Sequence, residues 1–153
     1  MSRKHLPSVA IVGRPNVGKS AIFNRLAGRR IAIVHDQPGV TRDRIAAECK
    51  QGRFTYELTD TGGIGAVLTD GFAEQVRTEA DIAIHSADLI LFVVDARDGI
   101  HPIDQELSNV LRKEAGNGKV LLIANKVDTA KTDNDVNEFP RLGFQDLIGI
   151  SAA

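Results

Sequence analysis

The amino-acid sequence predicts an α/β fold of three layers, in which helices cover both faces of a mostly parallel, six-stranded sheet. Three apolar runs, at 9–12, 89–94 and 120–124, are typical of strands that are buried on both faces. Apolar residues at helical spacing separate these runs, and strands that alternate with helices pair in parallel through right-handed crossovers. The 153 residues are enough for one core, so we expect residues 1–153 to form a single domain.

The N-terminal third begins with the strand at 9–12, which ends at Gly13. A helix is expected over 19–28, because its apolar residues lie on one face and its last residue is a glycine suited to a C-terminal cap. Residues 29–43 break the pattern with a cluster of turn-forming residues. This stretch therefore predicts a long exposed loop, and loops of that length usually have a function.

The next two runs, at 45–50 and 54–59, are separated by a short polar segment and predict a β-hairpin. Phe54, Tyr56 and Leu58 alternate along the second run and are expected to face inward. The βα alternation then resumes until the end of the chain. Its expected elements are a helix over 72–84, the strand at 89–94, a helix over 103–111, the strand at 120–124, a weak helix near 136–139 and a strand at 147–150.

The composition is typical of a soluble globular protein, with 42% hydrophobic and 25% charged residues. The net charge of −1 excludes a global basic field that would attract nucleic acid or an anionic membrane. The longest apolar run, at 89–94, is too short to span a bilayer, so we expect no membrane contact. The single cysteine, Cys49, is expected to pack as a small apolar side chain, and its lack of a disulfide partner favours a cytoplasmic location.

Residues 13–20 read Gly-Arg-Pro-Asn-Val-Gly-Lys-Ser and match the phosphate-binding loop at every required position. The motif lies between a buried strand and a helix, where backbone N–H groups can close around phosphate oxygens. In such a loop Lys19 bridges the terminal phosphates and the Ser20 hydroxyl binds Mg²⁺. The remaining nucleotide contacts are expected from Asn16, Val17, Gly18 and Ala21. A glycine-rich turn with an incidental lysine is the alternative, and the complete match in this context argues against it.

Two further motifs lie at strand ends. Asp60 closes the strand at 54–59, where its carboxylate would meet Mg²⁺ through water, and the Gly63 amide could bind a γ-phosphate and move when it leaves. Residues 125–128, Asn-Lys-Val-Asp, follow the third buried strand at the edge where ligands of open α/β sheets bind. Asp128 can accept both the N1–H and the 2-amino group of guanine, whereas adenine leaves it unpaired. Asn125 would brace the loop, and the stem of Lys126 would cover a ring face.

In this order, the motifs at 13–20, 38–43, 60–63, 125–128 and 151–153 resemble those of the Era-like, translation-factor-related GTPases. The resemblance covers essentially the whole chain and implies a P-loop GTPase fold that binds GTP and GDP. Within the family, residues 38–43, 60–64 and 94–97 most resemble the first GTPase domain of bacterial ribosome-assembly GTPases. Such proteins continue into a closing helix, a second GTPase domain and a KH-like domain. We therefore expect an N-terminal part of a longer protein, with the closing helix missing and with ribosomal-subunit or RNA contact made by other domains.

The resemblance also implies roles for single residues. Thr41 matches the switch threonine that binds Mg²⁺ and the γ-phosphate, which makes the loop at 29–43 a nucleotide-ordered switch. Asn16 matches the asparagine that binds a K⁺ ion beside the phosphates and so replaces an arginine finger. Residues Ser151, Ala152 and Ala153 match the loop that contacts guanine O6, with Ala152 N–H as the expected donor. The implied catalytic set is Lys19, Thr41, Gly63 and Asn16.

Two functions from different classes remain open: a GTP-hydrolysing switch, and a guanine-nucleotide binding module with negligible turnover. Ile64 stands where many GTPases have a glutamine that orients the attacking water, which predicts slow turnover and favours the second function. Asn16 favours the first, which is our main hypothesis. His35 in the loop is expected to be solvated, and residues 95–99 are interpreted as a turn rather than as a second acidic site.

Overall fold

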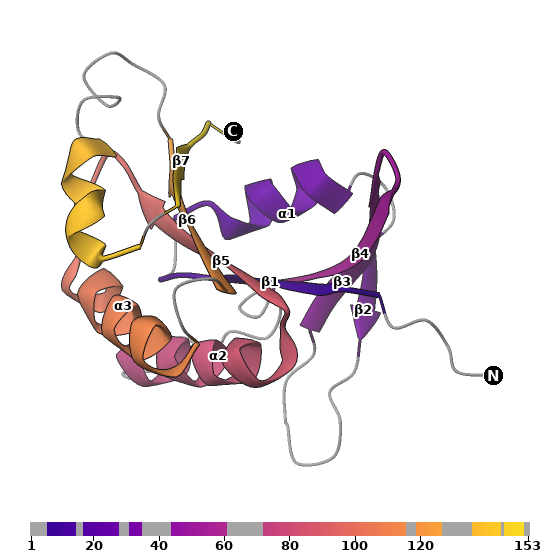
Figure 1. Cartoon of the computed structure of the whole chain (residues 1–153), viewed down its shortest axis with the longest axis horizontal. Helices are drawn as coiled ribbons and strands as arrows, with labels where there is room; N and C mark the ends of the chain where they lie inside the picture. Colours follow the sequence, from indigo (N-terminus) through magenta and orange to yellow (C-terminus); the bar gives the residue numbers. More distant parts are fainter. Residues whose placement is uncertain are drawn as a thin grey trace.

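The computed structural model describes residues 6–14, 17–27, 31–34, 44–60, 72–115, 119–126, 136–144 and 146–151. Its centre is a seven-stranded sheet in the order β2-β3-β4-β1-β5-β6-β7 (Figure 1). The strands are β1 Ser8–Val12, β2 Ile31–Val34, β3 Arg44–Gln51, β4 Phe54–Asp60, β5 Leu89–Asp95, β6 Val120–Asn125 and β7 Leu147–Gly149. The helices are α1 Lys19–Ala27, α2 Phe72–Ser86, α3 Pro102–Glu114 and the 3₁₀ helix η2 Val136–Leu142.

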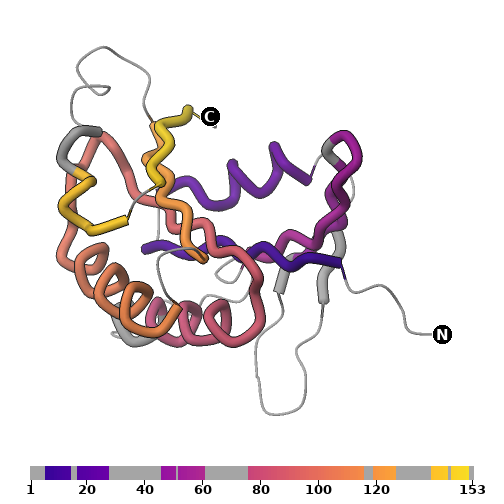
Figure 2. Tube along the Cα trace, in the orientation of Figure 1, coloured from indigo at the N-terminus to yellow at the C-terminus, as the bar shows by residue number. Residues whose placement is uncertain are grey.

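The strand pairing confirms the predicted α/β class. β1 pairs in parallel with β4 and β5, and the parallel part continues through β6 to β7. β2, β3 and β4 form the antiparallel part. β1 lies in the middle of the sheet. The colour gradient in Figure 2 shows that β2, β3 and β4, on one side of β1, precede β5, β6 and β7, on its other side, in the sequence. Because β4, β1, β5, β6 and β7 run parallel, their carboxyl ends lie at the same edge of the sheet.

One strand was missed in the sequence. β2 pairs antiparallel with β3, from Ile31 opposite Ala47 to Val34 opposite Arg44, so the interpretation of residues 31–34 as exposed loop was wrong and the sheet has seven strands rather than six. The physical reason is that an edge strand of four residues gives a weak apolar signal beside the turn-forming residues that follow it. The rest of the predicted loop, residues 35–43, lies outside the described residues.

The core has two parts because successive residues of a strand point to opposite faces. Ile11 of β1 packs with Phe23 of α1 on one face, whereas Ala10 and Val12 join the side chains of α2 and α3 on the other (Figure 1). The second part includes Phe92, whose ring meets that of Phe144 edge-on, with centroids 5.7 Å apart and an interplanar angle of 81°. The sheet is thus the middle of three layers, as predicted.

The β3–β4 hairpin confirms the predicted strands but not every predicted orientation. Leu58 is fully buried and Tyr56 is half-buried, but Phe54 is 77% exposed, so its expected inward position was wrong. Phe54 is the first residue of β4 beside the turn, where the hairpin extends past the cover of α1 (Figure 1). Cys49 is buried as expected, and burial raises the pKa of its thiol against the opposing effect of a hydrogen bond with Tyr56.

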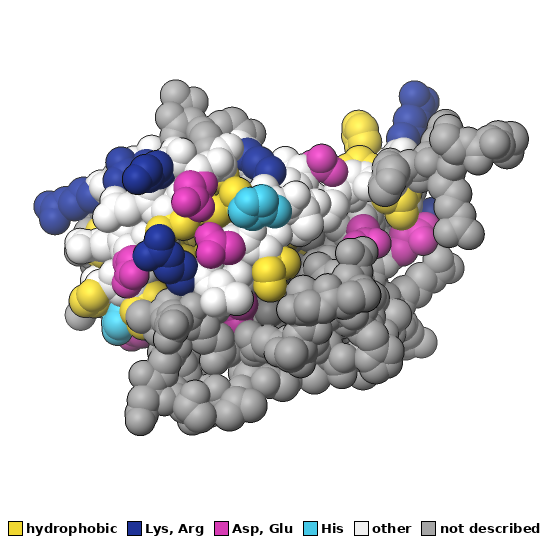
Figure 3. All heavy atoms as spheres, turned by 90° about the horizontal axis from the view of Figure 1, so that it is seen from below, with side chains coloured by type: hydrophobic (Ala, Val, Ile, Leu, Met, Phe, Trp, Pro, Cys, Tyr) yellow, Lys and Arg dark blue, Asp and Glu magenta, His cyan; other side chains and the backbone are white. Residues whose placement is uncertain are grey.

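Figure 3 views the molecule from the side of α2 and α3. On the described part of this face, acidic and basic side chains lie among one another rather than in separate patches. A shallow groove between the two helices is lined by Val76, Arg77, Ile103, Glu106, Leu107 and Val110. None of the helices in the described part of the chain is long and apolar enough to cross a membrane.

Candidate nucleotide-binding site

The described part of the phosphate loop is Gly13, Arg14 and residues 17–20, which run from the end of β1 into the first turn of α1. Gly13 lies against β5, and a Cβ atom added there would be 2.6 Å from the carbonyl oxygen of Val93. Only glycine allows this approach, because real Cβ atoms do not come so close to a carbonyl. Val17 is fully buried and packs in the α1 side of the core. The loop is therefore anchored at both ends by packing against the sheet.

Lys19 turns back over this loop. Its Nζ donates a hydrogen bond to the Gly13 carbonyl oxygen at 2.8 Å and lies 3.8 Å from Oε2 of Glu79 on α2. The side chains of Lys19 and Glu79 are only 11% and 3% exposed, so screening by water is limited. An ammonium group has three N–H donors, which suits a cation that bridges a carbonyl oxygen and the oxygens of a phosphate.

Ser20 and Asp60 come to the same edge of the sheet from different elements. Ser20, the last residue of the phosphate loop, is exposed in the first turn of α1. Asp60 ends β4, is 1% exposed and lies opposite Ile11 of the parallel neighbour β1. The hydroxyl and the buried carboxylate are hard oxygen donors of the kind that Mg²⁺ prefers. Within the described residues, no group of three or more His, Cys, Asp or Glu side chains could hold a metal ion.

Asn125 joins the guanine motif to the phosphate loop. It is the last residue of β6 and 2% exposed, and its Nδ2 donates a hydrogen bond to the Val17 carbonyl oxygen at 2.9 Å. Gly18 has a φ of +94°, and a Cβ atom there would overlap the Asn125 amide nitrogen. The glycine thus permits both the loop conformation and the close approach of the Asn125 side chain, which reaches the loop from the end of β6.

Lys126 has a partner that the sequence analysis missed. Its backbone is left-handed, with φ of 67°, and its Nζ forms an ion pair of 2.8 Å with Oδ2 of Asp95. The other oxygen of Asp95 accepts the backbone N–H of Arg97 at 2.8 Å. Burial alone would raise the pKa of Asp95, but the hydrogen bonds from Lys126 and from the Arg97 backbone hold it below its ordinary value. Asp95 and Asn125 end neighbouring strands and lie opposite each other, which the order of the strands in the sheet shows and the sequence does not.

Arg14 is a second missed residue. Its side chain is only 10% exposed, with Nη2 3.1 Å from Oδ2 of Asp98 and Nε 3.5 Å from Oδ1 of Asp104. Asp104 belongs to a capping box at the start of α3, in which it accepts the His101 backbone N–H at 2.9 Å. Burial raises the pKa of Asp104, although the His101 N–H and the charge of Arg14 act in the opposite direction.

The structure brings together only part of the predicted site. Ser151 is described and exposed after β7, where the Ile150 N–H bonds to the Ala124 carbonyl oxygen at 2.9 Å and holds this segment beside β6. The predicted residues that are described are Val17, Gly18, Lys19, Ser20, Ala21, Asp60, Asn125, Lys126 and Ser151. Those outside the described residues are Asn16, Thr41, Gly63, Ile64, Asp128, Ala152 and Ala153.

A phosphate loop between β1 and α1, clamped by the asparagine of a guanine motif at the end of β6, defines a P-loop GTPase domain. A family profile described as 50S ribosome-binding GTPase matches residues 8–126. The chain therefore belongs to the family of 50S ribosome-binding GTPases.

Curated relatives and solved structures agree with this assignment. The chain is 62% identical to a GTPase Der of Akkermansia muciniphila over 98% of its own length and 32% of the relative's. It is 49% identical to a GTPase Der of Clostridium botulinum strain Langeland over 96% of its length and 33% of the relative's. The chain thus spans about a third of the relatives that it matches. The resemblance to the first GTPase domain of EngA, also called Der, is confirmed.

Among solved structures, the G domain of the T. maritima FeoB iron transporter matches with a TM-score of 0.70 and 25% identity, over 97% of this chain and 89% of that domain. Era of Aquifex aeolicus, solved with GDP and AlF₄⁻, matches with a TM-score of 0.68 and 29% identity, over 97% of this chain and 52% of Era. Both likenesses confirm the P-loop GTPase fold.

Proposed function

We propose that this domain is a GTP-binding switch that hydrolyses GTP slowly and with Mg²⁺, as one GTPase domain of a longer protein. The observation that carries the proposal is the hydrogen bond from Asn125 to the Val17 carbonyl oxygen, which joins the guanine motif to the phosphate loop. A nucleotide that spans the phosphate loop and the guanine motif would place its phosphates beside Lys19 and its base at the end of β6. Asp128 would then select guanine, with Ser151, Ala152 and Ala153 near the base oxygen.

The residues present fit a magnesium ion. Ser20 would bind it directly and Asp60 through water, and Thr41 would complete the protein ligands when the switch is ordered. A bound Mg²⁺ would neutralise charge on the β- and γ-phosphates. The chain's own part is to hold the phosphates with the loop N–H groups of residues 16–21, to place the Lys19 ammonium against them, and to offer the Gly63 amide to the γ-phosphate.

Slow and potassium-stimulated turnover is the finer part of the proposal. Ile64 cannot orient a water molecule through a hydrogen bond, because its side chain has no polar atom. Asn16 would hold a K⁺ ion whose charge stabilises the transition state. The partner proposed for the whole protein is the 50S ribosomal subunit, which the family description names, and this implies a cytoplasmic location. Direct RNA contact is assigned to other domains of the parent chain, because this domain carries a net charge of only −1.

The test is phosphate release from GTP with Mg²⁺, in KCl and in NaCl of equal ionic strength, together with titration of GDP and ADP. Tight GDP binding, weak ADP binding and faster release in KCl are expected. Release that is equal in both salts contradicts the role of potassium. Tight GDP binding with no release in either salt supports the binding module instead of the switch, and failure to bind GDP overturns both.

A further inference from the structure

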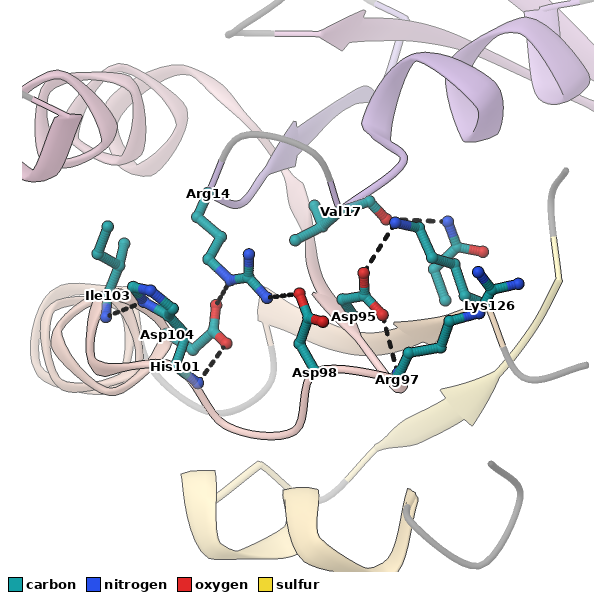
Figure 4. A network of polar contacts seen from close by, with 10 residues as sticks. Arg14, Val17, Asp95, Arg97, Asp98, His101, Ile103, Asp104 and Lys126 are labelled. Atoms are coloured by element: carbon teal, nitrogen blue, oxygen red, sulfur yellow. Dashed lines mark hydrogen bonds and ion pairs between the residues drawn. The ribbon is translucent and has the colours of Figure 1, made fainter. Parts of the chain in front are cut away.

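The β5–α3 turn, defined here as residues 95–101 and so including the last residue of β5, contacts both halves of the proposed nucleotide site (Figure 4). Its first residue, Asp95, forms the 2.8 Å ion pair with Lys126 of the guanine motif. Three residues later, Asp98 forms the 3.1 Å ion pair with Arg14 of the phosphate loop. One short turn therefore holds a charged side chain from each of two loops that are far apart in the sequence.

The contacts with the guanine motif are built rather than incidental. The Asp95 side chain is 4% exposed, and its two oxygens accept different donors, Lys126 Nζ and the Arg97 N–H. The next residue, Ala96, donates its backbone N–H to the Asn125 carbonyl oxygen at 2.9 Å. The turn thus fixes the backbone of Asn125 and the side chain of Lys126, which are the two described residues of the motif.

Arg14 of the phosphate loop contacts a buried carboxylate in addition to Asp98 of the turn. Arg14 reaches Asp98, which is 60% exposed, and also Asp104, which is fully buried. The Asp104 carboxylate accepts the His101 N–H, so it belongs to the capping box at the start of α3. Arg14 consequently ties the phosphate loop to an element that packs in the core through Leu107.

The hydrogen bond from Asn125 to the Val17 carbonyl oxygen closes these contacts into a ring that runs through the phosphate loop, the β5–α3 turn and the guanine motif. We propose that the β5–α3 turn is a brace that holds the guanine motif against the phosphate loop, with Asp95 and Arg14 as positioning residues for nucleotide binding. The inference rests on the proposed function. Its physical basis is preorganisation, because loops already fixed in the binding geometry lose less conformational entropy when the ligand binds.

The test is the Kd of GDP, measured by calorimetry with Mg²⁺ for the unaltered domain, Asp95→Asn, Lys126→Met and the double variant. Asp95→Asn keeps the size of the side chain but removes its negative charge, so the ion pair with Lys126 is lost and the Kd of GDP should rise about tenfold. If Asp95 acts through Lys126, adding Asp95→Asn to Lys126→Met should change the Kd less than about twofold. A merely structural loss would instead lower affinity in both backgrounds equally.

Asp88→Asn is the matched control. Asp88 precedes the other end of β5 and accepts the Ser8 N–H at 2.8 Å, so it is also a hydrogen-bonded aspartate, but it is remote from the site. Its Kd should stay within about twofold of the unaltered domain. If Asp95→Asn does not fold, Arg14→Gln tests the other arm and should raise the Kd about threefold to tenfold.

The outcomes separate the two proposals. If the unaltered domain fails to bind GDP, the proposed function and the brace both fall. If it binds GDP but Asp95→Asn or its substitute Arg14→Gln changes the Kd less than about twofold, the brace is overturned while the proposed function stands. Additive effects of Asp95→Asn and Lys126→Met on the Kd also overturn the brace, because they would show that Asp95 does not act through Lys126.

Discussion

Asp95 and Asp104 are two buried aspartates near the start of α3, and replacing each by asparagine should lower the free energy of unfolding by different amounts. Asp95 and Asp104 are 3% and 0% exposed, so both side chains are withdrawn from water. The pKa of Asp95 is lowered despite burial, because hydrogen bonds favour its charge, whereas burial raises the pKa of Asp104. We expect Asp95→Asn to destabilise the domain clearly and Asp104→Asn to cost much less.

The magnitudes follow from the donors that each carboxylate meets. Asp95→Asn can still accept the Arg97 N–H, but it loses a charged hydrogen bond to Lys126, worth about 2 kcal/mol. Asp104→Asn can still accept the His101 N–H. Its other oxygen lies 3.5 Å from Arg14 Nε and has no hydrogen-bond partner among the described residues, so the loss should stay within about 1 kcal/mol.

The assay is urea denaturation at neutral pH, where a loss of about 2 kcal/mol lowers the midpoint by about 1 M. The pH dependence gives a second reading of the same difference. The ionised Asp95 contributes stability above its ordinary pKa of 3.8, and this contribution is lost as the pH falls toward its lowered folded pKa. The deficit of Asp95→Asn should therefore persist at mildly acidic pH and shrink only below 3.8.

The contribution of Asp104 to stability depends on pH in the opposite direction. Its protonated form is favoured by folding, so its contribution is present below 3.8 and is lost as the pH rises through the raised folded pKa. Acidification from neutral pH should stabilise the unaltered domain relative to Asp104→Asn. If Asp104→Asn costs as much as Asp95→Asn at neutral pH, or if acidification does not favour the unaltered domain over it, the assignment of the two carboxylates is refuted.

Three further substitutions test the site and the core. Gly18→Ala should raise the Kd of GDP at least about tenfold, since its positive φ and the Asn125 amide leave no room for a Cβ; unchanged binding contradicts this. Glu79→Gln should tighten GDP binding about threefold in calorimetry, because it removes a negative charge 3.8 Å from Lys19; weaker binding would show that Glu79 helps to hold the lysine in place. Leu111→Ala should lower the free energy of unfolding by about 3 kcal/mol in urea, and a loss under about 1 kcal/mol would show that its fully buried position can collapse.

The parts of the fold that could be predicted are those with a continuous local signal. The strand β5 has six buried residues in seven, so its apolar run could be recognised from neighbours in the chain alone. β2 could not, because a strand of four residues at the sheet edge gains its stability from pairing with β3 rather than from its own pattern. Phe54 shows the same limit, since alternation places a side chain on a face but cannot tell where the covering helix ends.

The candidate site divides in the same way. The phosphate loop is contiguous, so its spacing alone predicts the roles of Lys19 and Ser20. The contacts of Arg14 with Asp98 and of Lys126 with Asp95 join residues that are 84 and 31 positions apart. No local pattern indicates such pairs, and the stretch at 95–99 has the composition of an ordinary turn. They became visible only when the sheet order placed β1, β5 and β6 side by side.

The chemistry of arginine explains how residue 14 contacts both Asp98 and Asp104. A guanidinium group has N–H donors on separate nitrogens in a fixed plane, so Nη2 can face Asp98 while Nε faces Asp104. A lysine has one nitrogen and could not meet two carboxylates on different elements with the same geometry. The described part of the phosphate loop is therefore held by Arg14, the side chain next to Gly13, as well as by Asn125. Arg14 attaches the loop to the β5–α3 turn and the start of α3, and Asn125 attaches it to the end of β6, so elements at one edge of the sheet hold the proposed nucleotide site.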